Sequence, residues 1–204
     1  MPIVLTVDQR RSRGMPDRVD AILARLNRLP TLAAFERTAG DELQGLLTDH
    51  LSVVAAIVDL VNDGHWSIGM GIGAVEQPIP TSTRAARGPA YTLARTAVEA
   101  AKHAPAHLAV RGVDRATADD VEATLGLLAV VVAGRSPQAR EAIDLAESGL
   151  TQTEIAVKLG VTRQAVSQRL GAAHWREELR ARPTLVRLLA RAETAAAGTP
   201  AVPA

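Results

Sequence analysis

The spacing of apolar residues divides the chain into a mixed α/β part and an all-helical part. Short apolar runs predict strands at residues 2–7, 32–37, 66–74 and 108–111, and the first of them is rich in β-branched residues. Apolar residues at helical spacing predict helices, at residues 17–28, 49–61, 89–102 and 117–132. Residues 42–47 either pair back as a further strand after the turn at residues 38–41 or lead into the next helix. This alternation favours a mixed sheet covered by helices over an all-helical fold.

Two of these helices have burial patterns that can be stated residue by residue. The helix at residues 49–61 ends at Gly64 and carries a stripe that we expect to be buried, formed by Leu51, Val54, Ile57, Val58 and Val61. The helix at residues 117–132 becomes entirely apolar towards its end. We therefore expect that end to be buried between the two halves of the protein.

The predicted strand at residues 66–74 has two unlike faces. One face holds only small residues, Ser67, Gly69, Gly71 and Gly73. A row of glycines on one face indicates that something packs or binds very close to the backbone there. Glycines at this spacing also occur in dinucleotide-binding loops. A proline-containing loop follows them here instead of a helix, which excludes that interpretation.

The C-terminal part predicts four helices in close succession, at residues 137–148, 151–159, 162–173 and 176–193. Ser136 and Thr151 can cap the first two of them, and Glu154 completes a capping box with Thr151. Gly160 can adopt the left-handed backbone that ends one helix and turns the chain. We expect a mixed-sheet domain over residues 1–114, a connecting helix over 115–135, a helical domain over 136–194 and a disordered tail over 195–204.

Residues 149–175 have the pattern of a helix-turn-helix. Both of its helices have an apolar face, formed by Ile155, Ala156 and Leu159 and by Val161, Val166 and Leu170. The outward side chains of the second helix are hydrogen-bond donors suited to base edges and phosphates in the major groove. The candidate DNA-binding residues are Thr151, Gln152, Thr162, Arg163, Gln164, Ser167, Gln168 and Arg169. A polar surface helix in a small bundle remains the alternative.

Composition narrows the partners that this motif can have. The formal net charge is +1, so binding to DNA must come from a local surface and not from a basic field over the whole chain. Aromatic residues make up 2% of the chain, which argues against a protein that binds single strands by stacking. We expect a homodimer on double-stranded DNA, with two half-sites one helical turn apart, because one such helix covers a single half-site.

Other classes of protein are disfavoured by what the sequence lacks. It has no cysteine, which excludes thiolate zinc sites and cysteine nucleophiles. His103 and His107 have the spacing of a metal-binding pair on a helix, but Pro105 between them breaks that geometry. No segment has the pattern of a signal peptide or the length of a membrane span, so we expect a cytoplasmic protein without membrane contact.

Two aspartates suggest a site in the N-terminal part. Asp8 ends the first predicted strand, and Asp41 lies at the tip of the predicted hairpin. If that strand lies beside the hairpin, both carboxylates come to one edge of the sheet. Two oxygen ligands are the minimum for Mg²⁺, and nearby Arg10, Arg11 and Arg13 could neutralise a polyphosphate. The alternative is that both aspartates only cap or form turns.

Several segments of the N-terminal part resemble the SatD family. They occur in that family's order over residues 3–103, as Asp8-x-x-x-Ser12-Arg13, TAGDELQGLL at 38–47, Gly71-Ile72-Gly73 and GPAYTLAR at 88–95. The same order resembles, more distantly, class III nucleotide cyclases and GGDEF-type diguanylate cyclases. Residues 136–175 are similar to helix-turn-helix domains of LuxR and sigma-factor region 4 type. The implied fold class is α+β, with a palm-like, ferredoxin-like mixed-sheet domain followed by an all-α helix-turn-helix domain.

The resemblance also implies a metal and nucleotide site. It places Asp8 and Asp41 as metal ligands, and the further candidate nucleotide-binding residues are Ser12, Arg13 and Glu42. The chain departs from the cyclases on the helix at residues 89–102, where Thr92 stands near the place of an asparagine and Arg95 is displaced. A domain that senses a ligand or dimerises is therefore favoured over an active cyclase.

The main hypothesis is a dimeric transcriptional regulator that reads DNA with its C-terminal domain. Its N-terminal domain would dimerise and sense a nucleotide, with no obligatory cofactor and with Mg²⁺ as the candidate metal. The alternative from a different class is a metal-dependent nucleotide enzyme with a DNA-binding tail. A third hypothesis is a DNA organiser that uses many weak sites.

Overall fold

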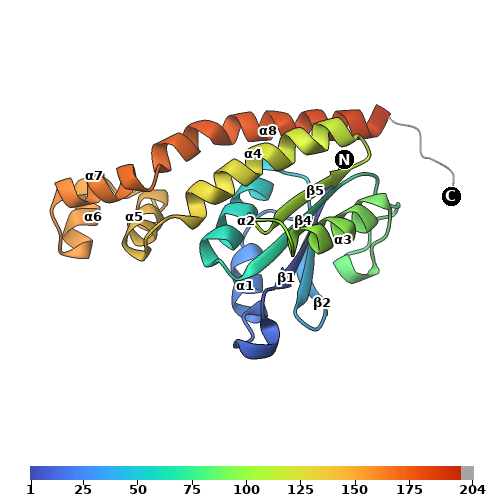
Figure 1. Ribbon diagram of the computed structural model, residues 1–204, viewed down its shortest axis with the longest axis horizontal. Helices are drawn as coiled ribbons and strands as arrows, with labels where there is room; N and C mark the ends of the chain where they lie inside the picture. The colour runs from blue at the N-terminus through green and yellow to red at the C-terminus, as the bar shows by residue number, and fades with distance from the viewer. Residues whose placement is uncertain (199–204) are drawn as a thin grey trace.

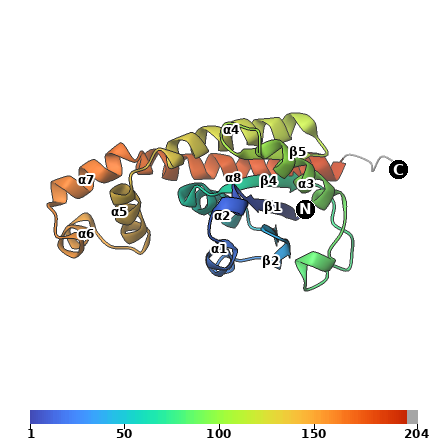
Figure 2. The same cartoon turned by 60° about the horizontal axis from the view of Figure 1, so that its bottom comes forward.

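The structure is a computed structural model that describes residues 1–198, apart from the side chain of Arg13. It is a mixed α+β fold, with one five-stranded mixed sheet and eight α-helices among the described residues (Figure 1). The sheet and the helices that cover it form one end of an elongated molecule, and three short C-terminal helices form the other end (Figures 1 and 2). Residues 199–204, which belong to the expected disordered tail, lie outside the described residues.

The sheet consists of β1 (Ile3–Gln9), β2 (Ala33–Ala39), β3 (Glu42–Leu47), β4 (Trp66–Ile72) and β5 (Leu108–Gly112). Their spatial order is β2-β3-β1-β4-β5. All neighbouring strands are antiparallel except β4 and β5, which are parallel. The predicted strands are confirmed, and residues 42–47 form a strand and not the start of a helix. Gly40, with φ of 58°, makes the turn between β2 and β3.

The helices are α1 (Val19–Leu26), α2 (His50–Asp63), α3 (Pro89–Ala101), α4 (Arg115–Ala133), α5 (Pro137–Glu147), α6 (Gln152–Leu159), α7 (Arg163–Ala172) and α8 (Trp175–Gly198). Two short 3₁₀ helices, Ser12–Gly14 and Thr83–Ala85, lie in loops. Every predicted helix is present. The expectation of a disordered tail from residue 195 is wrong for residues 195–198, because α8 continues to Gly198 and buries Ala196 in the core.

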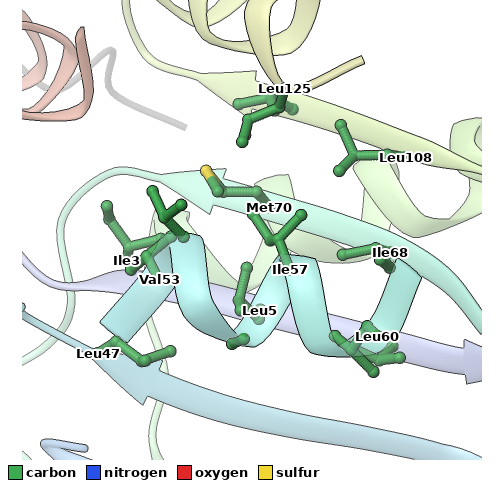
Figure 3. Packing of buried hydrophobic residues seen from close by; sticks show 14 of the residues in the cluster. Ile3, Leu5, Leu47, Val53, Ile57, Leu60, Ile68, Met70, Leu108 and Leu125 are labelled. Carbon is green, nitrogen blue, oxygen red and sulfur yellow. The ribbon is translucent and has the colours of Figure 1, made fainter. Parts of the chain in front are cut away.

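One face of the sheet carries the main core. Here α2 crosses the strands, and Figure 3 shows its residue Ile57 beside Met70 of β4 and above Leu5 of β1. Leu125 of α4 and Leu189 of α8 belong to the same cluster. The alternation of β1 explains this arrangement, because every second residue of a strand points to the same face.

The buried face of α2 differs from the predicted stripe. Val54, Ile57 and Val58 are buried as expected, but Leu51 is 57% exposed and Val61 is only partly buried. Val53, Leu60, Ser52 and Ala56 are buried as well. The expectation for Leu51 is wrong because the buried face of α2 is centred on Val53, Ile57 and Leu60, and Leu51 lies outside that face.

The opposite face of the sheet is covered by α3. An ideal Cβ on Gly71 would lie 2.0 Å from the carbonyl oxygen of Ala90, and one on Gly69 would lie 2.2 Å from the amide nitrogen of Val98. These glycines therefore allow the backbone of α3 to rest directly on the backbone of β4. The predicted close approach to the glycine face is confirmed, and the element that approaches is a helix.

The apolar end of α4 is buried on one side only, so the sequence-based expectation of a buried end is wrong for its other side. Leu127, Val130 and Val131 are 73%, 67% and 36% exposed. Burial on α4 is confined to its other side, where Val121, Leu125, Leu128 and Val132 belong to the main core. The helix is apolar around much of its circumference, but β5 and α8 cover only part of it.

The three short helices α5, α6 and α7 enclose a second, smaller core, composed of Ala139, Ala142, Ile143, Ile155, Ala156, Val166, Leu170 and Ala173. A buried ion pair lies beside it. The guanidinium of Arg135 donates to the carbonyl oxygen of Ala173 and to the carboxylate of Glu178, and Arg182 donates to that carboxylate as well. Because Glu178 is fully buried, these donors are needed to hold its charge.

Candidate functional site

The turn between α6 and α7 has the local structure that the sequence predicts. Thr151 and Glu154 form a complete capping box at the start of α6. Gly160 ends that helix in the left-handed region, with φ of 64°. Thr162 then caps α7 by accepting a hydrogen bond from the amide of Ala165 at 3.1 Å. The direction of α7 is therefore set by two caps and one glycine.

The apolar positions hold α6 and α7 together as predicted. Ile155, Ala156, Val166 and Leu170 are buried in the second core, and Leu159 and Val161 pack against it. This packing buries one side of α7 and leaves its other side free to contact a partner.

The other side of α7 carries exposed hydrogen-bond donors, and the charged side chains of this helix are positive. The exposed residues of the candidate set are Thr151, Thr162, Arg163, Gln164, Ser167 and Gln168, while Gln152 and Arg169 are partly buried. The charged residues of α7 are Arg163 and Arg169, both positive. The acidic side chains Glu141, Asp144 and Glu147 lie on α5 instead. An anionic partner would therefore meet α7 and not α5.

The structure brings the acidic residues of the N-terminal part together at one end of the sheet. Asp8 of β1 pairs in register with Glu42 of β3, and the amide of Gln9 donates to the carbonyl oxygen of Asp41 at 3.4 Å. Side chains of α3 already engage two of these carboxylates. Lys102 lies 3.4 Å from Asp8, and Arg95 lies 3.3 Å from Glu42.

Burial and these neighbouring charges together shift the pKa of Asp8. Burial is the largest influence and raises the pKa of the Asp8 carboxyl above its usual value, while Lys102 opposes this and the charges of Asp41 and Glu42 add to it. Within residues 1–198, no group of three or more His, Cys, Asp or Glu side chains is arranged to hold a metal ion. Mg²⁺ can be held by fewer protein ligands with water completing its shell, so the Asp8 and Asp41 metal site stays a prediction.

A basic hollow adjoins Asp8. It has a volume of about 480 Å³ and is lined by Asp8, Gln9, Arg10, Arg11, Ser12, Ser67, Lys102 and His107. Burial lowers the pKa of Arg10, and neighbouring Arg11 lowers it further. Burial also lowers the pKa of His107, with the charge of Arg10 as the next cause. The hollow therefore contains positive charge that its own carboxylate does not fully offset.

Sequence reasoning missed Lys102 and His107 as members of this site. The structure places Lys102 at the end of α3 and His107 just before β5, in a left-handed turn with φ of 49°. Ser12, a candidate nucleotide-binding residue, lines the hollow, whereas the side chain of Arg13 lies outside the described part of the structure. The signal that could have found His107 was its place before a strand parallel to β4, since both strands begin at this end of the sheet.

We expect Asp8→Asn to stabilise the protein near neutral pH. A carboxyl whose folded pKa is raised favours folding below its unfolded pKa, about 4, and this contribution is lost as pH rises through the folded pKa. The variant should therefore melt at a higher temperature than the wild type at about pH 7, and the difference should shrink towards about pH 4. Thermal unfolding at both pH values measures this.

Asp49→Asn is the matched control. The hydroxyl of Ser52 lowers the pKa of Asp49, so this substitution should change the stability at neutral pH in the opposite direction. That variant should lose stability at neutral pH, and the loss should disappear in acid as the wild-type carboxylate is protonated. A neutral-pH destabilisation by Asp8→Asn would show that the attraction of Lys102 outweighs burial.

Comparison with known proteins gives no relative from which a function could be transferred. No protein-family model matches the chain, and no curated protein or solved structure matches it either. Among residues 1–198, no helix has both the length and the apolar character needed to cross a membrane.

Proposed function

We propose that the protein is a sequence-specific regulator of transcription that binds double-stranded DNA through α7. The observation that carries this proposal is the free side of α7, where Arg163, Gln164, Ser167 and Gln168 are exposed on a helix without acidic residues. Arginine forms bidentate bonds to guanine edges and glutamine to adenine edges, and both fit the major groove. A helix-turn-helix places the N-terminal residues of its second helix at those edges. In this protein the four exposed residues of α7 would take that place.

The first helix of the motif would contact the DNA backbone. Gln152 begins α6, and the cap residue Thr151 lies immediately before it. A helix N-terminus attracts phosphate because its first amides lack partners within the helix. Thr162 and Arg169 would complete the phosphate contacts on α7. These contacts would set the register, and the exposed side chains of α7 would select the sequence.

The sheet domain is proposed to be palm-like. Strands β1 to β4 with α1 and α2 have the chain order βαββαβ, and the spatial order β2-β3-β1-β4 is that of a ferredoxin-like sheet. The strand β5 extends this sheet by one further strand, which pairs parallel to β4 at its edge. This order supports the resemblance to the palm-like families and supports a dimerising or ligand-sensing role for the domain.

Sequencing of genomic DNA fragments retained by the purified protein at physiological salt tests the regulator. The Arg163→Ala/Gln168→Ala variant is treated in parallel. We expect a few enriched palindromic sites for the wild type and their loss in the variant. Absence of enrichment, or equal enrichment for the variant, would contradict a base-reading α7. Steep cooperativity along long DNA without short sites would favour the DNA organiser.

We propose nucleotide binding as a second function, for the basic hollow beside Asp8. The observation that favours it is the grouping of Arg10, Arg11, Lys102 and His107 around one opening. Burial is the main cause that lowers the pKa of Arg10 and of His107, and repulsion between neighbouring cations adds to it. Phosphate groups there would relieve that repulsion. If Mg²⁺ accompanies the nucleotide, Asp8 and Asp41 are the residues that would hold it.

Calorimetric titration with ATP and GTP, with and without Mg²⁺, tests the second function. Binding should weaken in Arg10→Ala and stay unchanged in Arg28→Ala, since Arg28 is exposed and does not line the hollow. Asp8→Ala and Asp41→Ala should remove the part of the binding that depends on Mg²⁺. If these two variants instead lose a nucleotide turnover while DNA binding is intact, the protein is an enzyme with a DNA-binding tail.

A further inference from the structure

An uncharged apolar row follows the exposed side of α4. Leu127 and Val130 are 73% and 67% exposed, and the smaller residues Ala123 and Gly126 lie on the same side of the helix. Glu122 is the one charged residue between Asp120 and Arg135. It points away from the row, because it accepts from the amide of Val110 and from Arg111. Large apolar side chains exposed in a contiguous row mark an interaction surface.

The row continues into a shallow hollow between α4 and α8, which run side by side in both views (Figures 1 and 2). This hollow has a volume of about 350 Å³ and is lined mainly by apolar atoms, from residues that include Leu127, Leu128, Val131, Ala181 and Leu185. Glu177 lines its end near Val131. At the other end of the same groove, Arg191 of α8 lies 3.9 Å from Asp120 of α4.

We propose that this face binds a second copy of the chain, with α4 antiparallel to α4 of that copy about a two-fold axis beside Leu127. In this arrangement Val130 of each copy lies over Ala123 of the other, and Leu127 lies over Gly126. Large residues therefore meet small ones on both sides of the axis. A two-fold contact requires such self-complementarity, because residue i contacts j wherever j contacts i.

Charge complementarity supports the same orientation. The axis reverses the direction of the helices but keeps α8 of one copy facing α8 of the other. Glu177, beside Val131, is thereby brought opposite Arg191, beside Asp120, on the second copy. Both residues are exposed, and the ion pair of Arg191 with Asp120 in its own chain is long, at 3.9 Å, so each can reach the other copy. A parallel pair would have its two-fold axis along the helices, which would place the two α8 helices on opposite sides and lose this pairing of Glu177 with Arg191.

The dimer has a consequence for the proposed DNA binding, and only this consequence rests on that proposal. The helices α5, α6 and α7 follow the C-terminal end of α4 and project beyond the sheet domain (Figure 1). An antiparallel pair of α4 helices places the two α7 helices at opposite ends of the dimer. The half-sites are then separated by more than one turn of DNA, in contrast to the adjacent half-sites that the sequence suggested.

Sedimentation velocity of the full chain without DNA, over a range of concentrations, tests the dimer. The wild type is expected to dimerise, and Leu127→Asp should raise the dissociation constant at least about 100-fold, because it places an unpaired charge in an apolar contact. Leu51→Asp is the matched control, since Leu51 is 57% exposed on α2 and lies outside the row. Its dissociation constant should equal that of the wild type.

A charge swap tests the orientation. Glu177→Arg and Arg191→Glu should each weaken the dimer, and the chain that carries both should dimerise better than either single variant. Circular dichroism confirms that each variant is folded. A monomeric wild type, an undiminished dimer in Leu127→Asp, or equal loss in Leu51→Asp would overturn the proposal. Arg163→Ala/Gln168→Ala should remain dimeric, so a failure of DNA binding is distinguishable from a failure of this contact.

Discussion

Gly71→Ala is expected to destabilise the protein by about 3 kcal/mol or more, which is much of the stability of an ordinary domain. The added Cβ would lie 2.0 Å from the carbonyl oxygen of Ala90 and 2.5 Å from the amide nitrogen of Ala94. Both atoms belong to the backbone of α3, which cannot yield as the end of a flexible side chain can. The helix must move off the sheet, and the contacts of β4 and β1 with α3 are lost together. Denaturant unfolding followed by circular dichroism measures the loss.

Gly171→Ala is the matched control for this experiment. Gly171 lies within α7, and an added Cβ would meet no atom within 4 Å. Alanine is favoured over glycine in a helix, so this variant should be more stable than the wild type by about 0.5–1 kcal/mol. A wild-type free energy of unfolding for Gly71→Ala would mean that α3 does not rest on the backbone of β4.

Arg163→Ala and Gln168→Ala are each expected to weaken binding to the preferred DNA site by about tenfold to a hundredfold. Both side chains are exposed on α7, and neither makes a hydrogen bond that the fold needs, so folding should be unchanged. The loss should be specific to sequence, because binding to unrelated DNA depends on phosphate contacts. Titration of labelled duplexes containing the selected site and a scrambled site measures both affinities.

The salt dependence of DNA affinity distinguishes Arg163→Ala from Gln168→Ala. If Arg163 also contacts a phosphate, its replacement lowers the slope of log affinity against log salt by about 1, whereas Gln168→Ala leaves the slope unchanged. Arg187→Ala is the control. Arg187 is an exposed arginine of α8 whose hydrogen bond to Thr184 stays within that helix. Equal losses on the selected and the scrambled duplex would assign α7 to the DNA backbone instead of the bases.

The sheet could be predicted because its strands carry their own alternation. In β4 small residues alternate with apolar ones along the strand, and Gly69 and Gly71 predicted a close approach to the small face without naming the element, which is α3. The turn between α6 and α7 was predictable for a similar reason, since a capping box and a left-handed glycine act within a few residues. These features depend on neighbours in the chain.

Burial on α2 and α4 was harder to predict. Both helices are apolar on more than one side, so periodicity allows several buried faces. On α2 the actual face excludes Leu51, and on α4 it excludes Leu127 and Val130, all of which are exposed. The choice was made on α4 by the positions of β5 and α8 and on α2 by those of β4, α4 and α8, which are mostly distant in the chain. An apolar residue on a helix is buried only where another element reaches it.

The site at the end of the sheet was predicted in part. Asp8 and Asp41 were expected at one edge, and the pairing of β1 with β3 brings their residues together. Lys102 and His107 could not be assigned to the same place, because the route of the chain from α3 into β5 decides where they lie. With them the site changes from an acidic pair to a hollow with mixed charge.

Local chemistry alone determined the strands, the helix caps and the outward donors of α7, because each depends on residues within one or two turns of chain. Tertiary structure decided which apolar side chains are covered and which charges meet. Lys102, at the end of α3, meets Asp8 of β1, and the row at Leu127 is left open, through the packing of elements far apart in sequence. Such contacts follow from the packing of whole elements, which no local pattern specifies.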